Sequence, residues 1–180
     1  MFALTRRLTL RPGWPEEAAA LARAIGHEAV VRNLARAPWP YTLGDAEAYL
    51  ALPRAPDEPR FQIVTRADGR LIGGIALLCE EDGVHELGYW LAPEAWGRGY
   101  ATEAGQAVIA IARDTMRLKH VRARHHAENP ASGRVLRKLG FVETGRSRTF
   151  SLARGHEVPS VEMALALGEP DADAQPAMAA

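Results

Sequence analysis

The middle of the chain reads Val84-His-Glu-Leu-Gly-Tyr-Trp-Leu-Ala-Pro-Glu-Ala-Trp-Gly-Arg-Gly-Tyr-Ala101, and this stretch decides the fold that the sequence predicts. Residues 84–91 are rich in β-branched and aromatic side chains, which favours a strand, and Ala-rich helical sequence begins near Ala101. Between them, Gly97 and Gly99 can take positive φ, so that consecutive N–H groups turn toward one point and continue into the free N–H groups of the helix. The stretch therefore predicts a strand, a phosphate-binding loop and a helix.

Composition limits the classes of protein that the chain can belong to. With 180 residues, 47% of them hydrophobic, the chain is long enough for one domain with a core. Lys+Arg 22 balances Asp+Glu 22, so we expect neither nucleic acid nor an anionic membrane as a partner. Cys79 is the only cysteine and ends an apolar run on a predicted strand, so it is expected in the core. No signal peptide or apolar run near ~20 residues is present, which, with the single cysteine, predicts a cytoplasmic protein.

The expected elements alternate in a way that predicts an α/β (α+β) domain. We expect residues 1–167 to form this single domain and the small, acidic, proline-bearing tail 168–180 to be disordered. Strands are expected at 4–10, 61–65, 71–79, 84–91, 120–126, 141–144 and 161–167. Helices are expected at 15–25, 28–36, 43–52, from 101 onward and from 130 onward. Short acidic turns with glycine join the strands between 61 and 91, which predicts an antiparallel meander.

Three motifs in order resemble one known family. The loop Trp96-Gly-Arg-Gly-Tyr-Ala101, the later Asn129-Pro-Ala-Ser132 and the following Leu139-Gly-Phe141 are similar to those of the GNAT family of acetyl-CoA-dependent N-acetyltransferases. The resemblance covers roughly residues 5 to 167, and its nearest branch is that of the ribosomal-protein amino-terminal acetyltransferases, the RimJ/RimL-like proteins. One position departs from the pattern, because Trp96 stands where the family commonly has Gln or Arg.

The resemblance implies a GNAT-like acyl-CoA N-acyltransferase fold. That fold is a mixed, mostly antiparallel, twisted sheet of about seven strands flanked by helices and splayed open between strands 84–91 and 120–126. Acetyl-CoA would bind in the opening, with its pantetheine arm along the strand edge and its pyrophosphate on residues 96–102. The cofactor-binding residues implied in this way are Tyr89, Trp90, Leu91, Trp96, Gly97, Arg98, Gly99, Tyr100, Ala101, Thr102, Asn129 and Ser132.

The resemblance also implies two catalytic residues. Glu86 would deprotonate the attacking amine through a water, and Ser132 would donate a hydrogen bond to the thiolate that leaves as coenzyme A. Each has a plain alternative: Glu86 could be a solvent-facing or salt-bridged carboxylate, and Ser132 an ordinary residue of a first helical turn. Asn129 precedes a proline and could serve only as a helix cap. Leu136 stands where many relatives have Tyr, so no tyrosine acid is expected there.

The expected protein is thus an enzyme that moves an acetyl group directly to a primary amine in a ternary complex. The acceptor stays open between a protein amino terminus and a small-molecule amine, and the oligomeric state between monomer and homodimer. Trp39 and Tyr41 are candidates for lining the acceptor pocket, with packing in the core as the favoured alternative for Trp39. No metal is expected, because His125 and His126 alternate on a strand and point to opposite faces.

Two other functions remain possible. A non-catalytic acyl-CoA sensor would keep the loop without the acceptor chemistry. A dinucleotide-binding domain is less favoured, because Thr102 stands where the third glycine of that fingerprint belongs.

Overall fold

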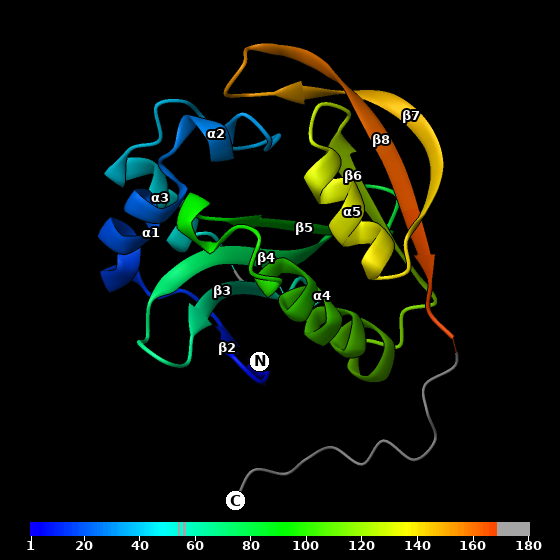
Figure 1. The fold of residues 1–180 in the computed structure, drawn as a ribbon, viewed down its shortest axis with the longest axis horizontal. Helices are drawn as coiled ribbons and strands as arrows, with labels where there is room; N and C mark the ends of the chain where they lie inside the picture. Colours follow the sequence, from blue (N-terminus) through cyan, green and yellow to red (C-terminus); the bar gives the residue numbers. More distant parts are fainter. Residues whose placement is uncertain (54, 56, 169–180) are drawn as a thin grey trace, which may run out of the picture.

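The computed structural model describes residues 1–53, 55 and 57–168. An open sheet of eight strands runs through it in the order β1-β2-β3-β4-β5-β6-β8-β7 (Figure 1). Neighbouring strands are antiparallel except β5 and β6, which are parallel. This is the predicted mixed, mostly antiparallel sheet, with eight strands in place of about seven. The tail expected to be disordered lies, from residue 169 on, outside the described residues.

The additional strand comes from a turn inside the first predicted one. The predicted strand 4–10 divides at Thr5, whose N–H donates to the Leu8 carbonyl at 2.9 Å and whose Oγ1 accepts from the Leu8 N–H at 2.9 Å. Because these bonds close a turn, the chain reverses and pairs with itself. The strands of the sheet are β1 Ala3–Leu4, β2 Leu8–Arg11, β3 Arg60–Thr65, β4 Leu71–Cys79, β5 His85–Leu91, β6 His120–His126, β7 Val142–Ser151 and β8 His156–Ala166.

The helices begin where the sequence predicts, with one that ends early. They are η1 Pro15–Glu17, α1 Ala18–Ile25, α2 Glu28–Val31, α3 Leu43–Leu50, η2 Pro93–Ala95, α4 Tyr100–Ala110, the π-helical turn η3 Ile111–Thr115 and α5 Pro130–Lys138. Thr42 caps α3 as expected, since its Oγ1 accepts from the Asp45 N–H at 3.2 Å. The prediction that α2 continues to Arg36 is wrong. None of the helices in these described parts is long and apolar enough to cross a bilayer.

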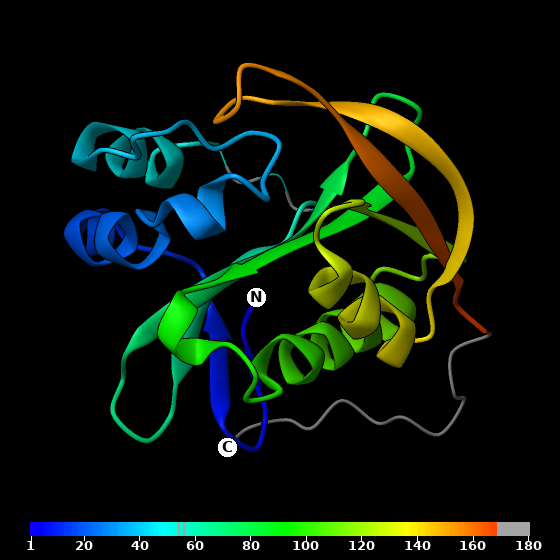
Figure 2. The ribbon, with the colours of Figure 1, turned by 45° about the horizontal axis from the view of Figure 1, so that its top comes forward.

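The sheet separates two groups of helices, which is clearest in Figure 2. On one face α4 and α5 cover the larger core, to which α4 contributes Ala101, Ala104 and Val108 and the π-helical turn contributes Ala112. On the other face α1, α2 and α3 pack in smaller clusters around the partly buried Trp90. The helical first third of the chain therefore lies across the sheet from the helix that follows the glycine loop.

The last two strands form one long hairpin, in contrast to the prediction of short strands 141–144 and 161–167 with a polar connection. β7 pairs with β8 from Val142↔Ala164 to Ser151↔His156, so the polar segment is itself strand. β7 is an edge strand with exposed side chains, and ion pairs such as Arg148–Glu157 (3.3 Å) lie along it. Polar residues suit an edge strand, which explains why they did not read as β structure.

Candidate active site

The parallel pair β5 and β6 separates after two residue pairs. Only Glu86↔Arg122 and Leu87↔Ala123 are in register, although β5 continues to Leu91 with β4 along its other edge. No strand of the described chain pairs with the β6-facing edge of β5 from Gly88 to Leu91. The sheet is therefore open at the place where the sequence predicts a splay.

The glycine loop begins at the end of this open edge. Gly97 and Gly99 have φ of +70° and +78°, the left-handed region that glycine adopts without strain, and α4 starts at Tyr100. Within the described residues, the N–H groups of residues 97 to 102 donate no hydrogen bond, whereas the Trp96 N–H donates to the Pro93 carbonyl at 3.1 Å. A run of unpaired amides at the N-terminus of a helix is a ready anion site.

Trp96 closes the loop with its side chain. The indole N–H donates to the Leu91 carbonyl at 2.8 Å, so it ties the loop back to the last residue of β5. This contact accounts for the departure from the Gln or Arg that is common at this position. Trp96 therefore shapes the loop, and the polar contact that Gln or Arg would offer is missing here.

Arg7, on the turn between β1 and β2, fixes the loop from outside. Its Nη1 donates to the Arg98 carbonyl at 3.0 Å and its Nε to Glu103 Oε2 at 2.7 Å, and the guanidinium lies 4.6 Å from the ring centre of Tyr100. Burial raises the pKa of Glu103, but hydrogen bonds from Thr5 and Arg7 outweigh it, so the pKa lies below its usual value. The carboxylate stays ionised and holds Arg7 against the loop.

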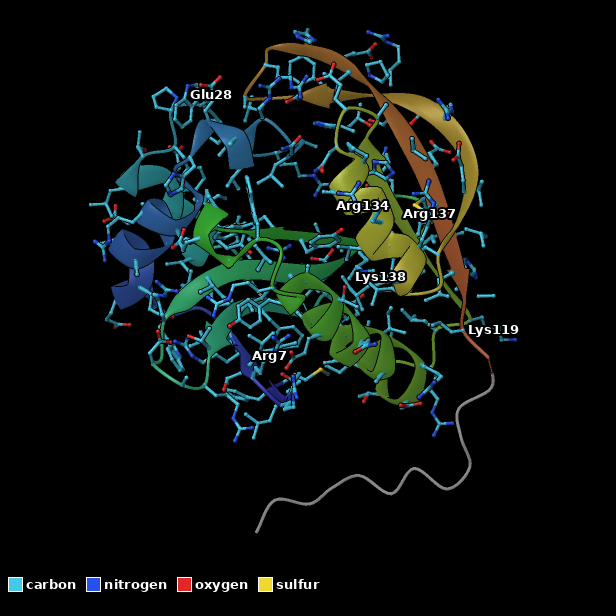
Figure 3. The ribbon with its side chains drawn as sticks, in the orientation of Figure 1. Arg7, Glu28, Lys119, Arg134, Arg137 and Lys138 are labelled. Carbon is cyan, nitrogen blue, oxygen red and sulfur yellow. The ribbon has the colours of Figure 1, made fainter. Side chains whose placement is uncertain are left out.

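An open hollow lies beside the first turn of α4. Its lining includes the cations Arg6, Arg7 and Lys138 together with Gly99, Thr102 and Gln106. Figure 3 shows Arg7 below α4 and Lys138 on α5 with Arg134 and Arg137. Three cations therefore lie next to the unpaired amides together with one acid, Glu103, which is paired with Arg7, although the whole chain has no net charge.

Tyr89 and Ser132 meet across the opening. The Tyr89 hydroxyl lies 2.7 Å from Ser132 Oγ and 3.1 Å from the Ser132 carbonyl oxygen. Burial raises the pKa of Tyr89 to about 12, so the phenol is protonated at neutral pH. Asn129 caps α5, since its Oδ1 accepts from the Ser132 N–H at 3.2 Å. The sequence predicts a cofactor-binding position at Tyr89 but gives no sign that its side chain reaches Ser132.

Glu86 carries an ion pair. Arg124 Nη2 lies 2.7 Å from Glu86 Oε2, and both side chains are about a quarter to a third exposed. The pair links β5 to β6 just before the two strands separate. Because side chains alternate along a strand, Glu86 and Tyr89 lie on opposite faces of β5. The two predicted catalytic residues are thus not in contact: Glu86 lies on one face of β5, and Ser132 contacts Tyr89 on the other.

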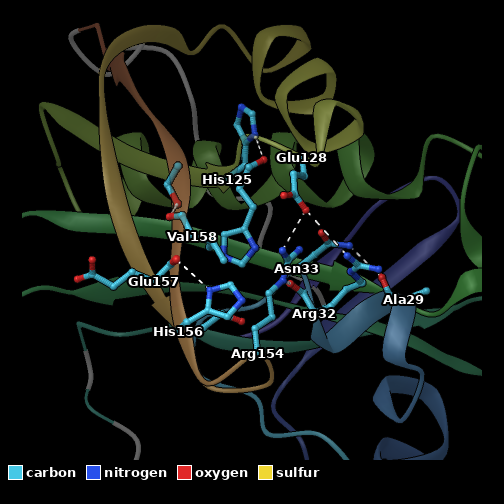
Figure 4. A network of polar contacts seen from close by, with 12 residues as sticks. Ala29, Arg32, Asn33, His125, Glu128, Arg154, His156, Glu157 and Val158 are labelled. Atoms are coloured by element: carbon cyan, nitrogen blue, oxygen red, sulfur yellow. Dashed lines mark hydrogen bonds and ion pairs between the residues drawn. The ribbon is translucent and has the colours of Figure 1, made fainter.

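The tip of the β7–β8 hairpin packs against the segment that follows α2. Arg154 Nε donates to the Arg32 carbonyl at 3.0 Å, and the Leu152 N–H donates to the Ala35 carbonyl at 2.9 Å. Arg154 Nη1 also donates to Glu128 Oε2 at 3.0 Å (Figure 4). These contacts hold residues 32–35 in an irregular path, which is why α2 is shorter than predicted. The segment after α2 and the hairpin tip lie side by side in both views (Figures 1 and 2).

The other predicted residues fall on both sides of the site. Trp90 packs against the N-terminal helices, and a Cβ at Gly74 would lie 2.7 Å from its indole nitrogen, so only the main chain of Trp90 faces the opening. Trp39 is 43% exposed, which argues against the core position, and Tyr41 is partly buried between two clusters of the N-terminal helices. His125 and His126 are both buried.

Among the described residues, one group of potential metal ligands gathers at the start of β5. Ligand atoms of Asp57, Cys79 and His85 are within 4.8 Å of one another. The His85 Nε2 already lies 2.8 Å from the Asp57 carbonyl oxygen, and Asp57 is exposed. Cys79, expected in the core, is partly exposed. We assign no metal to this group.

Comparison with known proteins places these features in context. Residues 7–142 match the family described as Acetyltransferase (GNAT) domain. Over 98 residues the chain is 33% identical to the uncharacterized N-acetyltransferase p20 of Bacillus licheniformis, a match that covers 53% of this chain and 55% of that protein. The chain spans about half the length of the curated relatives it matches.

Solved structures have the same fold over nearly the whole chain. A GNAT-family acetyltransferase from Bacillus anthracis superposes with a TM-score of 0.81 at 21% identity, covering 92% of this chain and 98% of the other. RimL, the ribosomal L7/L12 alpha-N-protein acetyltransferase in complex with coenzyme A, superposes with a TM-score of 0.76 at 16% identity, covering 93% and 98%. The predicted family and fold are confirmed, and the ribosomal-protein branch is represented among these neighbours.

Proposed function

Because the chain belongs to the GNAT acetyltransferase family, we propose that it is an N-acetyltransferase that uses acetyl-CoA to acetylate a primary amine. When bound, acetyl-CoA supplies an acetyl thioester that an amine can attack directly. The observation that carries the proposal is the row of unpaired amides at residues 97 to 102, which follows the unpaired edge of β5. The fit is chemical, since amides that point to one place suit a diphosphate and an open strand edge suits the amides of a pantetheine arm.

The chain offers a separate contact for the far end of coenzyme A. Lys138 is exposed on α5 and lines the hollow next to Thr102 and Gln106. A cation that lines the same hollow as Gly99 and Thr102 would pair with the ribose phosphate, beyond the pyrophosphate. Arg7 is less suited to that task, because its guanidinium already binds Glu103 and the Arg98 carbonyl.

Glu86 is the proposed base, and its ion pair sets a condition on that role. An α-amino group with a pKa near ~8 is partly neutral at physiological pH, whereas a lysine near ~10.4 must be deprotonated before it attacks. Arg124 holds the carboxylate of Glu86 in an ion pair and keeps it oriented, so Glu86 would take the proton through a water. We therefore propose that Glu86 matters more for a lysine acceptor than for an amino terminus.

Ser132 is the proposed donor to the leaving thiolate. It occupies the first turn of α5, where the helix dipole also favours negative charge. A thiol with a pKa near ~8.5 is already a tolerable leaving group at neutral pH, so a hydroxyl donor is sufficient.

The acceptor is proposed to enter from the side bridged by residues 32–35 and the hairpin tip. RimL acts on a protein amino terminus according to its name, which supports an acceptor of that kind here, and a small-molecule amine is the alternative. The single, unpaired Cys79 fits a reducing compartment, and the cytoplasm is the proposed location.

The test is a thiol-release assay with acetyl-CoA against three acceptor panels: peptides with free amino termini, lysine peptides with blocked termini, and small amines. We expect release with at least one panel and binding of coenzyme A by calorimetry. Ser132→Ala and Glu86→Gln should lower the rate without abolishing coenzyme A binding. The proposal is wrong if coenzyme A does not bind, whereas binding without release against any panel would favour the acyl-CoA sensor.

A further inference from the structure

The phenol of Tyr89 reaches a residue 43 positions away in the sequence. Tyr89 lies on β5, Ser132 on the first turn of α5, and their hydroxyl oxygens are 2.7 Å apart. The side chain of Tyr89 is largely buried, and Ser132 is half-buried. This contact spans the opening in the sheet, in the place where the proposed function puts the thioester.

Counting protons separates two arrangements of these groups. The Tyr89 hydroxyl has one proton and two acceptors within reach, Ser132 Oγ at 2.7 Å and the Ser132 carbonyl oxygen at 3.1 Å. If the phenol donates to the carbonyl, Ser132 must use its own proton on the phenol oxygen. If the phenol donates to Oγ, the Ser132 proton is free to point elsewhere. The 2.7 Å distance fits either hydroxyl as the donor, and only the second arrangement leaves the Ser132 proton free for an anion beside it.

We propose that Tyr89 is a positioning residue that donates to Ser132 Oγ and thereby leaves the Ser132 proton directed at the thiolate of coenzyme A. This inference rests on the proposed function, and it adds a residue that acts through Ser132. The acid of this site is thus a pair of hydroxyls from β5 and α5. In this chain Leu136 stands at the position where many relatives have a tyrosine, so the pair takes the place of a tyrosine acid there.

The step balances without proton loss from Tyr89. The amine nitrogen forms the new bond to the acetyl carbon, the carbon–sulfur bond breaks, and its electron pair remains on sulfur. Ser132 stabilises that thiolate by a hydrogen bond, and the proton that finally converts it to a thiol is the one that the amine gives up. Burial raises the pKa of Tyr89 to about 12. That is roughly three and a half pKa units above a thiol near ~8.5, so the phenol remains a donor throughout.

The experiment measures the thiol pKa of bound coenzyme A, which needs no knowledge of the acceptor. The ultraviolet absorbance of the thiolate is followed between about pH 6 and 9.5 for the complex, and the titrations of free protein and free coenzyme A are subtracted so that Cys79 cancels. The variants are Tyr89→Phe, which keeps the ring, Ser132→Ala and the double variant. Tyr49→Phe is the matched control, because it removes another buried phenol on α3.

In the wild type we expect the bound thiol pKa to be about one unit below its free value, since a hydrogen bond to a charged group is worth that much. Ser132→Ala should abolish this decrease, Tyr89→Phe should remove most of it, and the double variant should match Ser132→Ala. Tyr49→Phe should leave it unchanged. If the Tyr89–Ser132 hydrogen bond only joined α5 to β5, the variants would change the melting temperature and the affinity for coenzyme A but not the thiol pKa.

Three results would overturn the inference. The first is a wild-type thiol pKa that is not lowered in a complex that forms. The second is a Tyr89→Phe complex with the wild-type thiol pKa. The third is a low pKa that persists in Ser132→Ala but not in Tyr89→Phe, which would mean that the phenol contacts sulfur directly. If the wild type does not bind coenzyme A at all, the proposed function itself fails, and this outcome is distinct from the other three.

Discussion

Replacing Gly97 by Ala tests whether the loop amides hold a diphosphate. Gly97 has φ of +70°, and a Cβ there would meet no atom within 4 Å, so the substitution adds backbone strain without a steric clash. A non-glycine residue in the left-handed region costs roughly 1–2 kcal/mol. The loop can keep this strain, or it can rotate away and lose the alignment of its amides.

Rotation is the expected response, because the amides of residues 97 to 102 have no partners in the described chain that would resist it. Losing one hydrogen bond to a charged oxygen costs about 1.5–3 kcal/mol, which corresponds to an increase of roughly 10-fold to 150-fold in the dissociation constant of coenzyme A. Isothermal titration calorimetry measures that constant directly.

The matched control is Gly69→Ala. Gly69 has φ of +66°, and a Cβ there also meets nothing within 4 Å, but it lies in the turn between β3 and β4. Both variants should lose up to about 1–2 kcal/mol of stability in urea unfolding, while only Gly97→Ala should weaken coenzyme A binding. If Gly97→Ala binds coenzyme A as tightly as the wild type, the amides of this loop do not hold the diphosphate and the reasoning fails.

Three further predictions concern the charged groups around the site. Lys138→Gln should weaken coenzyme A about tenfold but leave dephospho-coenzyme A unchanged, since a charge-assisted contact is lost only with the first; equal weakening of both would exclude a contact to the ribose phosphate. Glu86→Gln should lower the rate with lysine peptides at least tenfold more than with amino-terminal peptides, measured by thiol release at pH 7; equal effects would remove Glu86 as the base. The folded pKa of Glu103 lies below its usual value of 4.5, so its ionised form adds stability above that pH and the contribution is lost as pH falls through the folded pKa. Urea unfolding should therefore show that Glu103→Gln loses less stability than the wild type between pH 7 and pH 4. Identical losses in the two proteins would contradict a stabilising contact between Glu103 and Arg7.

Local signals predicted the elements around the site well. The glycines at 97 and 99, the cap at Thr42 and the Asn129-Pro130 start of α5 each depend on bonds within a few residues, so the residue types determine them. Local signals failed where a polar segment takes its structure from pairing with a segment elsewhere in the chain. The β7–β8 hairpin and the early end of α2 are of this kind, because the hairpin tip supplies the donors for the carbonyls of Arg32 and Ala35.

Taken alone, the sequence determined the family and the strand–loop–helix that presents the amides. The tertiary structure alone decided which side chains meet across the opening between β5 and β6. Arg7 reaches Glu103 from the first turn of the chain, Arg124 reaches Glu86 from a strand that is parallel to β5, and Tyr89 reaches Ser132. Contacts between residues so far apart depend on the direction in which each element passes the others, and that direction is set by the packing of the whole sheet rather than by any local pattern.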